Sequence, residues 1–170
     1  MSQLRIETAQ GEFIVSLATN AAPKTTAYFA ELARTGALDN SSVFRLVSAD
    51  TKLHPAEHPI AVLQGGLTFD DPQPIPGVAH EGTNETLLQH RQWTVSTARF
   101  GPGETYGSFF VCMRDEPALD YGGLRHPDGL GFAAFGMVAA GHDVVHSIYA
   151  GCEADEMLRQ PIDIHRVSFE

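Results

Sequence analysis

The feature that most constrains the fold of this chain is a succession of short apolar segments separated by connections rich in proline and glycine. Apolar and polar residues alternate over 4–8, and they alternate again from Phe13 to Leu17, after a turn at Gly11. Alternation with a period of two on both sides of a short turn predicts a β-hairpin. Further strands are expected at 42–47, 60–65, 93–98, 108–113, 132–138 and 162–169.

Two helices are expected among these strands. Pro23 suits the first turn of a helix and Gly36 suits the position just past its end, so a helix is predicted over 23–34. A second, shorter helix is predicted over 143–150. Many short strands with few helices favour a closed or nearly closed antiparallel sheet, with the helices over its open ends. The length of 170 residues fits one domain.

The charge of the chain limits its partners. The net charge is −10, from 21 acidic and 11 basic side chains, and a charge of that sign repels phosphate backbones and acidic membranes. No apolar run is long enough to span a bilayer, and the first residues lack the pattern of a signal peptide. We therefore expect a cytoplasmic location and neither nucleic-acid nor membrane partners.

The two cysteines, Cys112 and Cys152, form no C-x-x-C pair. Free thiols are expected in a reducing compartment, and a single disulfide is the alternative.

Four segments, in order along the chain, share a pattern with one family. They are "DNSSVFRLV" (39–47), "VLQGG" (62–66), "STARFGPGETYGSFFV" (96–111) and "FAAFGMVAAGHDVVHSI" (132–148). These resemble the N-x-T-x-F-H-R-V-I, F-M-I-Q-G-G, M-A-R/N to Q-F-F-I, and H-V-V-F-G-K-V segments of the cyclophilin-type peptidyl-prolyl cis/trans isomerases. The resemblance implies a mainly β, closed eight-stranded antiparallel barrel capped by two α-helices, in one domain over 1–170. It also implies a monomer without cofactor or metal, acting on proline-containing peptides and on unfolded or folding proteins.

The chemistry of that family gives the matched residues their roles. Rotation about an X–Pro amide meets a barrier of about 18–20 kcal/mol, because the C–N bond has double-bond character. A catalyst must favour the twisted amide over the planar one, since only differential binding lowers the barrier. In the family an arginine hydrogen-bonds towards the prolyl nitrogen, and by the resemblance Arg45 takes this role. The guanidinium of Arg45 is rigid, planar and permanently charged, so a lysine at this position would be a poor substitute.

The resemblance also implies a substrate pocket. Phe110 would form the floor for the proline ring, with Val62, Leu119 and Phe132 as lining, and Gln64 would bind the substrate backbone. The main chain of Ala98 and Arg99 would pair with the residues that flank the proline. Ala61 and Ser108 stand where the family has phenylalanine and a second glutamine. Ala118 replaces a tryptophan that helps bind cyclosporin, so weak cyclosporin binding is expected.

Plainer readings stand beside these roles. A strand arginine such as Arg45 is commonly a solvated surface residue, and Phe110 in an apolar run is commonly part of a core. The chain could also be a cyclophilin-like module that binds X–Pro segments without useful turnover.

A third hypothesis is a metal-dependent hydrolase built on "HPAEH" (54–58), whose two histidines would bind zinc if the segment were helical. Pro55 and Pro59 disfavour helical angles at the residues before them. By the resemblance, 48–59 is instead an insertion beside the active site, and 121–131 is a glycine-rich loop.

Overall fold

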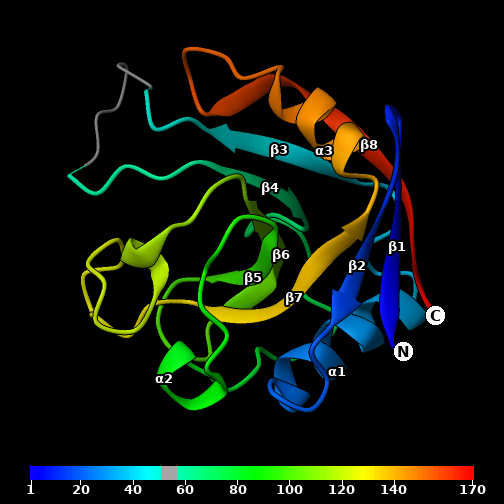
Figure 1. Ribbon diagram of the computed structural model, residues 1–170. Coiled ribbons are helices and arrows are strands. Elements are labelled where there is room, and N and C mark those ends of the chain that lie inside the picture. The colour runs from blue at the N-terminus through cyan, green and yellow to red at the C-terminus, as the bar shows by residue number, and fades with distance from the viewer. Residues whose placement is uncertain (51–56) are drawn as a thin grey trace.

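The computed structural model describes residues 1–50 and 57–170, which form a closed barrel of antiparallel strands (Figure 1). Around the barrel the strand order is β1-β2-β7-β5-β6-β4-β3-β8, and β8 pairs again with β1. The strands are β1 (Gln3–Thr8), β2 (Gly11–Leu17), β3 (Ser41–Val47), β4 (Val62–Gly66), β5 (Thr94–Arg99), β6 (Thr105–Cys112), β7 (Ala133–Ala140) and β8 (Met157–Phe169). The expected closed eight-stranded barrel is confirmed.

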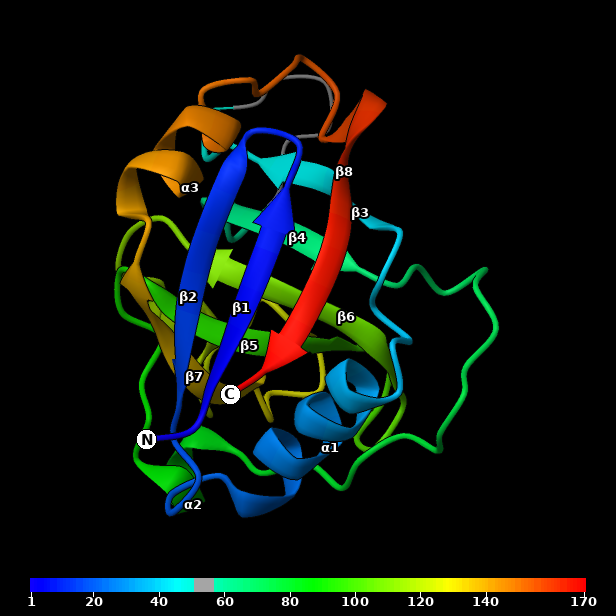
Figure 2. The same ribbon diagram turned by 90° about the vertical axis from the view of Figure 1, so that its right-hand side faces the viewer.

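Two main helices lie at opposite ends of the barrel, α1 (Pro23–Arg34) and α3 (His142–Tyr149) (Figures 1 and 2). A single-turn helix α2 (Thr83–Thr86) and a 3₁₀ turn η1 (Pro117–Leu119), neither of them expected from the sequence, interrupt the long connections. No helix in the described ranges is long and apolar enough to cross a membrane.

Helix α1 begins at Pro23 and ends at Arg34, as predicted from Pro23 in its first turn and Gly36 just past its end. Its N-terminus receives the buried carboxylate of Glu81, which accepts the backbone N–H of Thr25 at 2.7 Å. A negative charge at this end complements the helix dipole. On its buried face Phe29 stacks on Phe135 of β7 with ring centroids 4.4 Å apart, which fixes the helix over the barrel core.

Some strand boundaries differ from the prediction. β8 begins at Met157 rather than at 162, and Pro161 within it breaks the pattern that marks a strand in the sequence. β6 begins at Thr105 rather than at 108. Gly107, which has a positive φ, interrupts the apolar pattern, so the first residues of this strand were not expected from the sequence. β4 begins at Val62 rather than at 60.

Alternation along β4 and β6 separates two apolar clusters. Leu63 and Val111 point into the barrel and belong to its main core. Their neighbours Val62, Phe110 and Cys112 point the other way and form a smaller cluster on the outer face of the wall. The period-two pattern thus builds a core on one face and the floor of a groove on the other.

Candidate active site

A small cavity of about 120 Å³ lies over this outer cluster. It contains eight of the ten residues that the sequence placed in the site. Its lining comprises Arg45, Ile60, Val62, Gln64, Ala98, Arg99, Tyr106, Phe110, Leu119, Arg125 and Phe132. A cavity of this size suits a small ring, since drug-sized ligands occupy about 300–1,000 Å³.

The floor of the cavity is apolar. Phe110 is buried, and the ring of Phe132 meets it edge-on with centroids 5.6 Å apart. Val62 and Leu119 are buried beside them. Such a surface can take the pyrrolidine ring of a proline out of water.

Arg45 stands at the edge of this floor, and two neighbours hold it. Its Nη1 donates to Gln64 Oε1 at 2.9 Å, from the residue opposite it on β4. Its Nε and Nη2 both donate to Glu156 Oε1, at 3.1 and 2.9 Å. A guanidinium has five N–H groups, so these bonds orient Arg45 and leave two N–H groups for a substrate.

Gln64 is itself fixed from behind. Its Nε2 donates to Ser108 Oγ at 2.9 Å and to the Tyr106 hydroxyl at 3.3 Å. Ser108 is fully buried and does not line the cavity. Its role in this geometry is therefore to position Gln64, and through Gln64 the guanidinium of Arg45.

Arg99 joins the cavity to the loop over 121–131. Its Nη1 and Nη2 donate to the two carboxylate oxygens of Asp128 at 2.8 and 3.0 Å, and its Nε donates to the Gly131 carbonyl at 3.1 Å. The hydrogen bond from Arg99 lowers the pKa of Asp128 to about 2. The β5–β6 register shifts between Thr97 and Arg99, at Ala98, where the expected substrate-pairing segment lies.

The wall that was expected at Ala61 is formed by Ile60 instead. Ala61 packs in the barrel core and does not line the cavity. Sequence reasoning also missed Tyr106, Arg125 and Glu156. The first two lie in connections or at a strand end without periodicity, and Glu156 is 111 residues from Arg45 in the chain.

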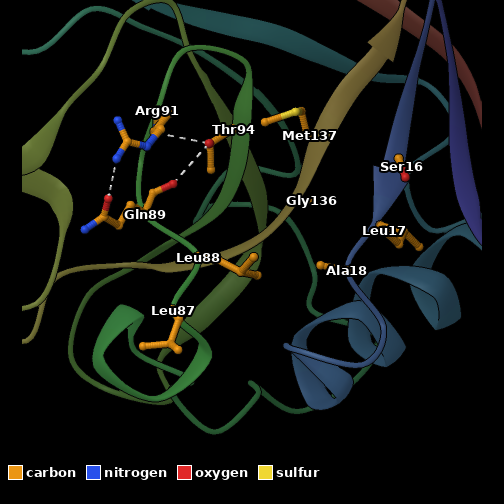
Figure 3. A pocket seen from close by; sticks show the side chains of 10 residues that line it. All are labelled: Ser16, Leu17, Ala18, Leu87, Leu88, Gln89, Arg91, Thr94, Gly136 and Met137. Carbon is orange, nitrogen blue, oxygen red and sulfur yellow. Dashed lines mark hydrogen bonds between the residues drawn. The ribbon is translucent and has the colours of Figure 1, made fainter.

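A larger cavity of about 460 Å³ lies between β2, β7 and the segment after α2 (Figure 3). Several of its polar groups already have hydrogen-bond partners. Arg91 donates from Nη2 to Gln89 Oε1 at 2.8 Å, and the Thr94 hydroxyl donates to the Gln89 carbonyl at 3.2 Å. None of the ten predicted site residues lines it. The smaller cavity is therefore the better candidate for chemistry.

Asp120, His90 and Ser96 form a chain of hydrogen bonds beneath the floor of the cavity, and this chain has a structural role. His90 Nδ1 lies 2.8 Å from Asp120 Oδ1 and its Nε2 lies 2.9 Å from Ser96 Oγ. Both His90 and Ser96 are buried, and the ring of Phe110 stacks on His90 at 5.9 Å. A substrate cannot reach this serine, so the chain of hydrogen bonds supports the floor rather than supplying a nucleophile.

The metal hypothesis gains no support from the described part of the chain. His54 lies outside the described residues, as does much of the proposed insertion at 48–59. Residues 1–50 and 57–170 contain no group of three or more metal-binding side chains. His142 and His146, one helical turn apart, both pack edge-on against Trp93. Cys112 and Cys152 are free thiols, and burial raises the pKa of Cys112.

Comparison with known proteins decides the family. The model of the cyclophilin type peptidyl-prolyl cis-trans isomerase/CLD family matches residues 3–169. The chain belongs to the cyclophilin family. A peptidyl-prolyl cis-trans isomerase, cyp18, of Streptomyces antibioticus is 30% identical over 149 residues, covering 87% of this chain and 83% of that protein. A peptidyl-prolyl cis-trans isomerase-like 1 of Neurospora crassa is 32% identical over 124 residues, covering 70% of this chain and 69% of that protein.

Solved cyclophilin structures share the fold. A cyclophilin type peptidyl-prolyl cis-trans isomerase of Cryptosporidium parvum, crystallised in the presence of the dipeptide Ala-Pro, superimposes with a TM-score of 0.78 at 18% identity. The match covers 99% of this chain and 98% of that one. The family and the barrel expected from the sequence are both confirmed.

Proposed function

We propose that this cyclophilin accelerates cis–trans rotation about X–Pro bonds in the groove over Phe110, with Arg45 as the catalytic residue. The observation that carries the proposal is the placement of a fixed guanidinium at the edge of a small apolar floor. Membership of an isomerase family supports it. The substrates are proline-containing segments of peptides and of folding proteins.

The geometry supports a simple mechanism. The proline ring enters the apolar cavity, and the chain before it lies along Gln64 and Ala98. As the amide twists, conjugation is lost and the prolyl nitrogen gains a lone pair that can accept a hydrogen bond. The two remaining N–H groups of Arg45 supply that bond to the twisted amide and none to the planar one. No nucleophile, acid or base takes part, since only a rotation is accelerated.

A protease-coupled assay on an X–Pro tetrapeptide tests the proposal. Arg45→Ala should lower kcat/KM by about 100-fold to 1,000-fold, the usual cost of removing one donor aimed at a transition state. Arg166→Ala is the matched control, because it removes an exposed arginine from β8. Equal rates for wild type and Arg45→Ala would refute the assignment.

A weakly active binding module is the second candidate, and one contact favours it. Glu156 accepts two of the N–H groups of Arg45, which leaves fewer for the substrate. In that case the wild type would bind X–Pro peptides in a titration without accelerating their isomerisation.

Three further expectations complete the proposal. Cyclosporin should bind weakly because Ala118 replaces a large aromatic side chain, which isothermal titration can measure. The protein should be monomeric in light-scattering measurements. It should be found in the cytoplasmic fraction of its cells.

A further inference from the structure

Three guanidinium groups line the same small cavity, although the chain carries a net charge of −10. Two of them are neutralised locally. Glu156 pairs with Arg45 at 2.9 Å, and Asp128 pairs with Arg99 at 2.8 Å. The third, Arg125, therefore gives the cavity an excess of positive charge.

Arg125 is held in place through main-chain contacts rather than through a carboxylate. Its backbone N–H donates to the carbonyl of Ala118 at 3.1 Å, and its Nη1 donates to the carbonyl of His58, also at 3.1 Å. In residues 1–50 and 57–170 it forms no ion pair. The sequence of 51–56 contains no Asp or Glu that could provide one.

The surroundings of Arg125 make its charge costly. Partial burial and the repulsion from Arg45 lower the pKa of Arg125, and the attraction of Glu156 and Glu116 only partly opposes this. An arginine nevertheless stays charged at neutral pH. A partly desolvated guanidinium whose remaining N–H groups meet no acceptor in residues 1–50 and 57–170 is a good site for a carboxylate, which it can bind through two parallel hydrogen bonds.

We propose that Arg125 is a specificity-determining residue that binds a carboxylate of the substrate within two residues of the proline. The groove would then select acidic X–Pro segments over neutral and basic ones. This inference rests on the proposed function, because the same groove must hold the peptide.

Blocked peptides that differ at one position test the proposal. Glu, Gln or Lys is placed one or two residues before the proline, or one or two residues after it, and isomerisation is followed by NMR exchange without a protease. In at least one register, kcat/KM for Glu should exceed that for Gln by about fivefold to tenfold at low salt. Lys should give the lowest value, and added salt should reduce the Glu preference.

Three variants separate the role of Arg125 from general effects. Arg125→Gln should bring the Glu-to-Gln ratio to about one; because each variant is compared with itself on the two peptides, the ratio reports the charge preference separately from any change in overall rate. Arg125→Lys keeps the charge without the fork and should restore part of the ratio. The control Arg166→Gln removes the same charge from the exposed face of β8 and should keep the wild-type ratio.

The outcomes distinguish this inference from the proposed function. A Glu-to-Gln ratio near one in every register, with the peptides still isomerised, overturns the role of Arg125 alone. A preference for the Glu peptide that persists in Arg125→Gln also overturns the role of Arg125. If the wild type accelerates none of the peptides, the proposed isomerase function fails. In that case, dissociation constants from NMR titration of the Glu and Gln peptides, with wild type and with Arg125→Gln, test the charge preference.

Discussion

At the scale of single residues, the site depends on a relay of polar contacts behind Arg45. Ser108 accepts from Gln64, and Gln64 accepts from Arg45, so the serine positions a guanidinium that it does not touch. The sequence placed Ser108 in the substrate pocket, because its position in the family pattern belongs to a longer glutamine. A shorter side chain at the same position reaches Gln64 instead of the cavity.

Ser108→Ala should lower kcat/KM by about fivefold, the equivalent of about 1 kcal/mol in the barrier. The reason is that Gln64 loses its shortest anchor and Arg45 becomes less well oriented. The free energy of unfolding should fall by about 1 kcal/mol, as for one buried hydrogen bond. Stopped-flow kinetics and denaturant unfolding measure the two effects.

The same substitution in an Arg45→Ala background is the control. If Ser108 acts through Arg45, it should cause no further loss of rate there. A further fivefold loss in the double variant would show that Ser108 acts independently.

At the scale of elements, the strands and α1 could be read from the sequence, and the connections could not. Pro23 and Gly36 mark both ends of α1, and alternation marks the strands. Glu156 and Arg125 lie in segments where no period relates one residue to the next. Their approach to Arg45 depends on how the barrel closes, which local sequence does not encode.

The loop over 121–131 is attached to β5 by the Arg99–Asp128 pair, which gives a prediction for acid stability. The pKa of Asp128 is lowered from 3.8 to about 2, chiefly by the hydrogen bond from Arg99. A lowered folded-state pKa stabilises the fold above about pH 4, and this stabilisation is lost as the pH falls towards 2. Asp128→Asn should therefore lower the free energy of unfolding at pH 7 by about 1 kcal/mol, the upper range for a partly exposed pair.

Denaturant unfolding between pH 7 and pH 2.5 measures this effect. The difference between wild type and Asp128→Asn should shrink as the pH falls, whereas the exposed Asp70→Asn should differ little from wild type throughout. A difference that stays constant over this range would contradict the assigned cause.

The junction of β4 and β6 depends on Gly66. It has φ +99°, and a Cβ there would lie 2.5 Å from the Gly107 carbonyl oxygen. Gly66→Ala should cost about 2–3 kcal/mol in the free energy of unfolding, from backbone strain and this close approach. Gly122→Ala is the matched control, because its φ is +83° but an added Cβ meets no described atom within 4 Å. Its cost should be about 1 kcal/mol, from φ alone. Equal costs in thermal unfolding would rule out the close approach.

At the scale of the whole molecule, one barrel wall carries two apolar surfaces with different tasks. The inward residues of β4 and β6 stabilise the fold, and the outward ones form the floor of the groove. Alternation predicted the strands of the barrel, whereas the ten site residues were expected only from the resemblance to the family; eight of these ten line one cavity. Ala61 was placed wrongly in the pocket wall, since it shares the inward face with Leu63.

The central claim is that the groove around Arg45 accelerates rotation about X–Pro bonds, and NMR exchange tests it directly. Uncatalysed rotation takes tens to hundreds of seconds, so a free X–Pro peptide gives no cis–trans exchange peaks on a sub-second timescale. A small amount of wild-type protein should produce such peaks, and a folded Arg45→Lys variant should nearly abolish them. The account is contradicted if the folded wild type produces no exchange peaks, or if Arg45→Lys produces peaks of equal intensity.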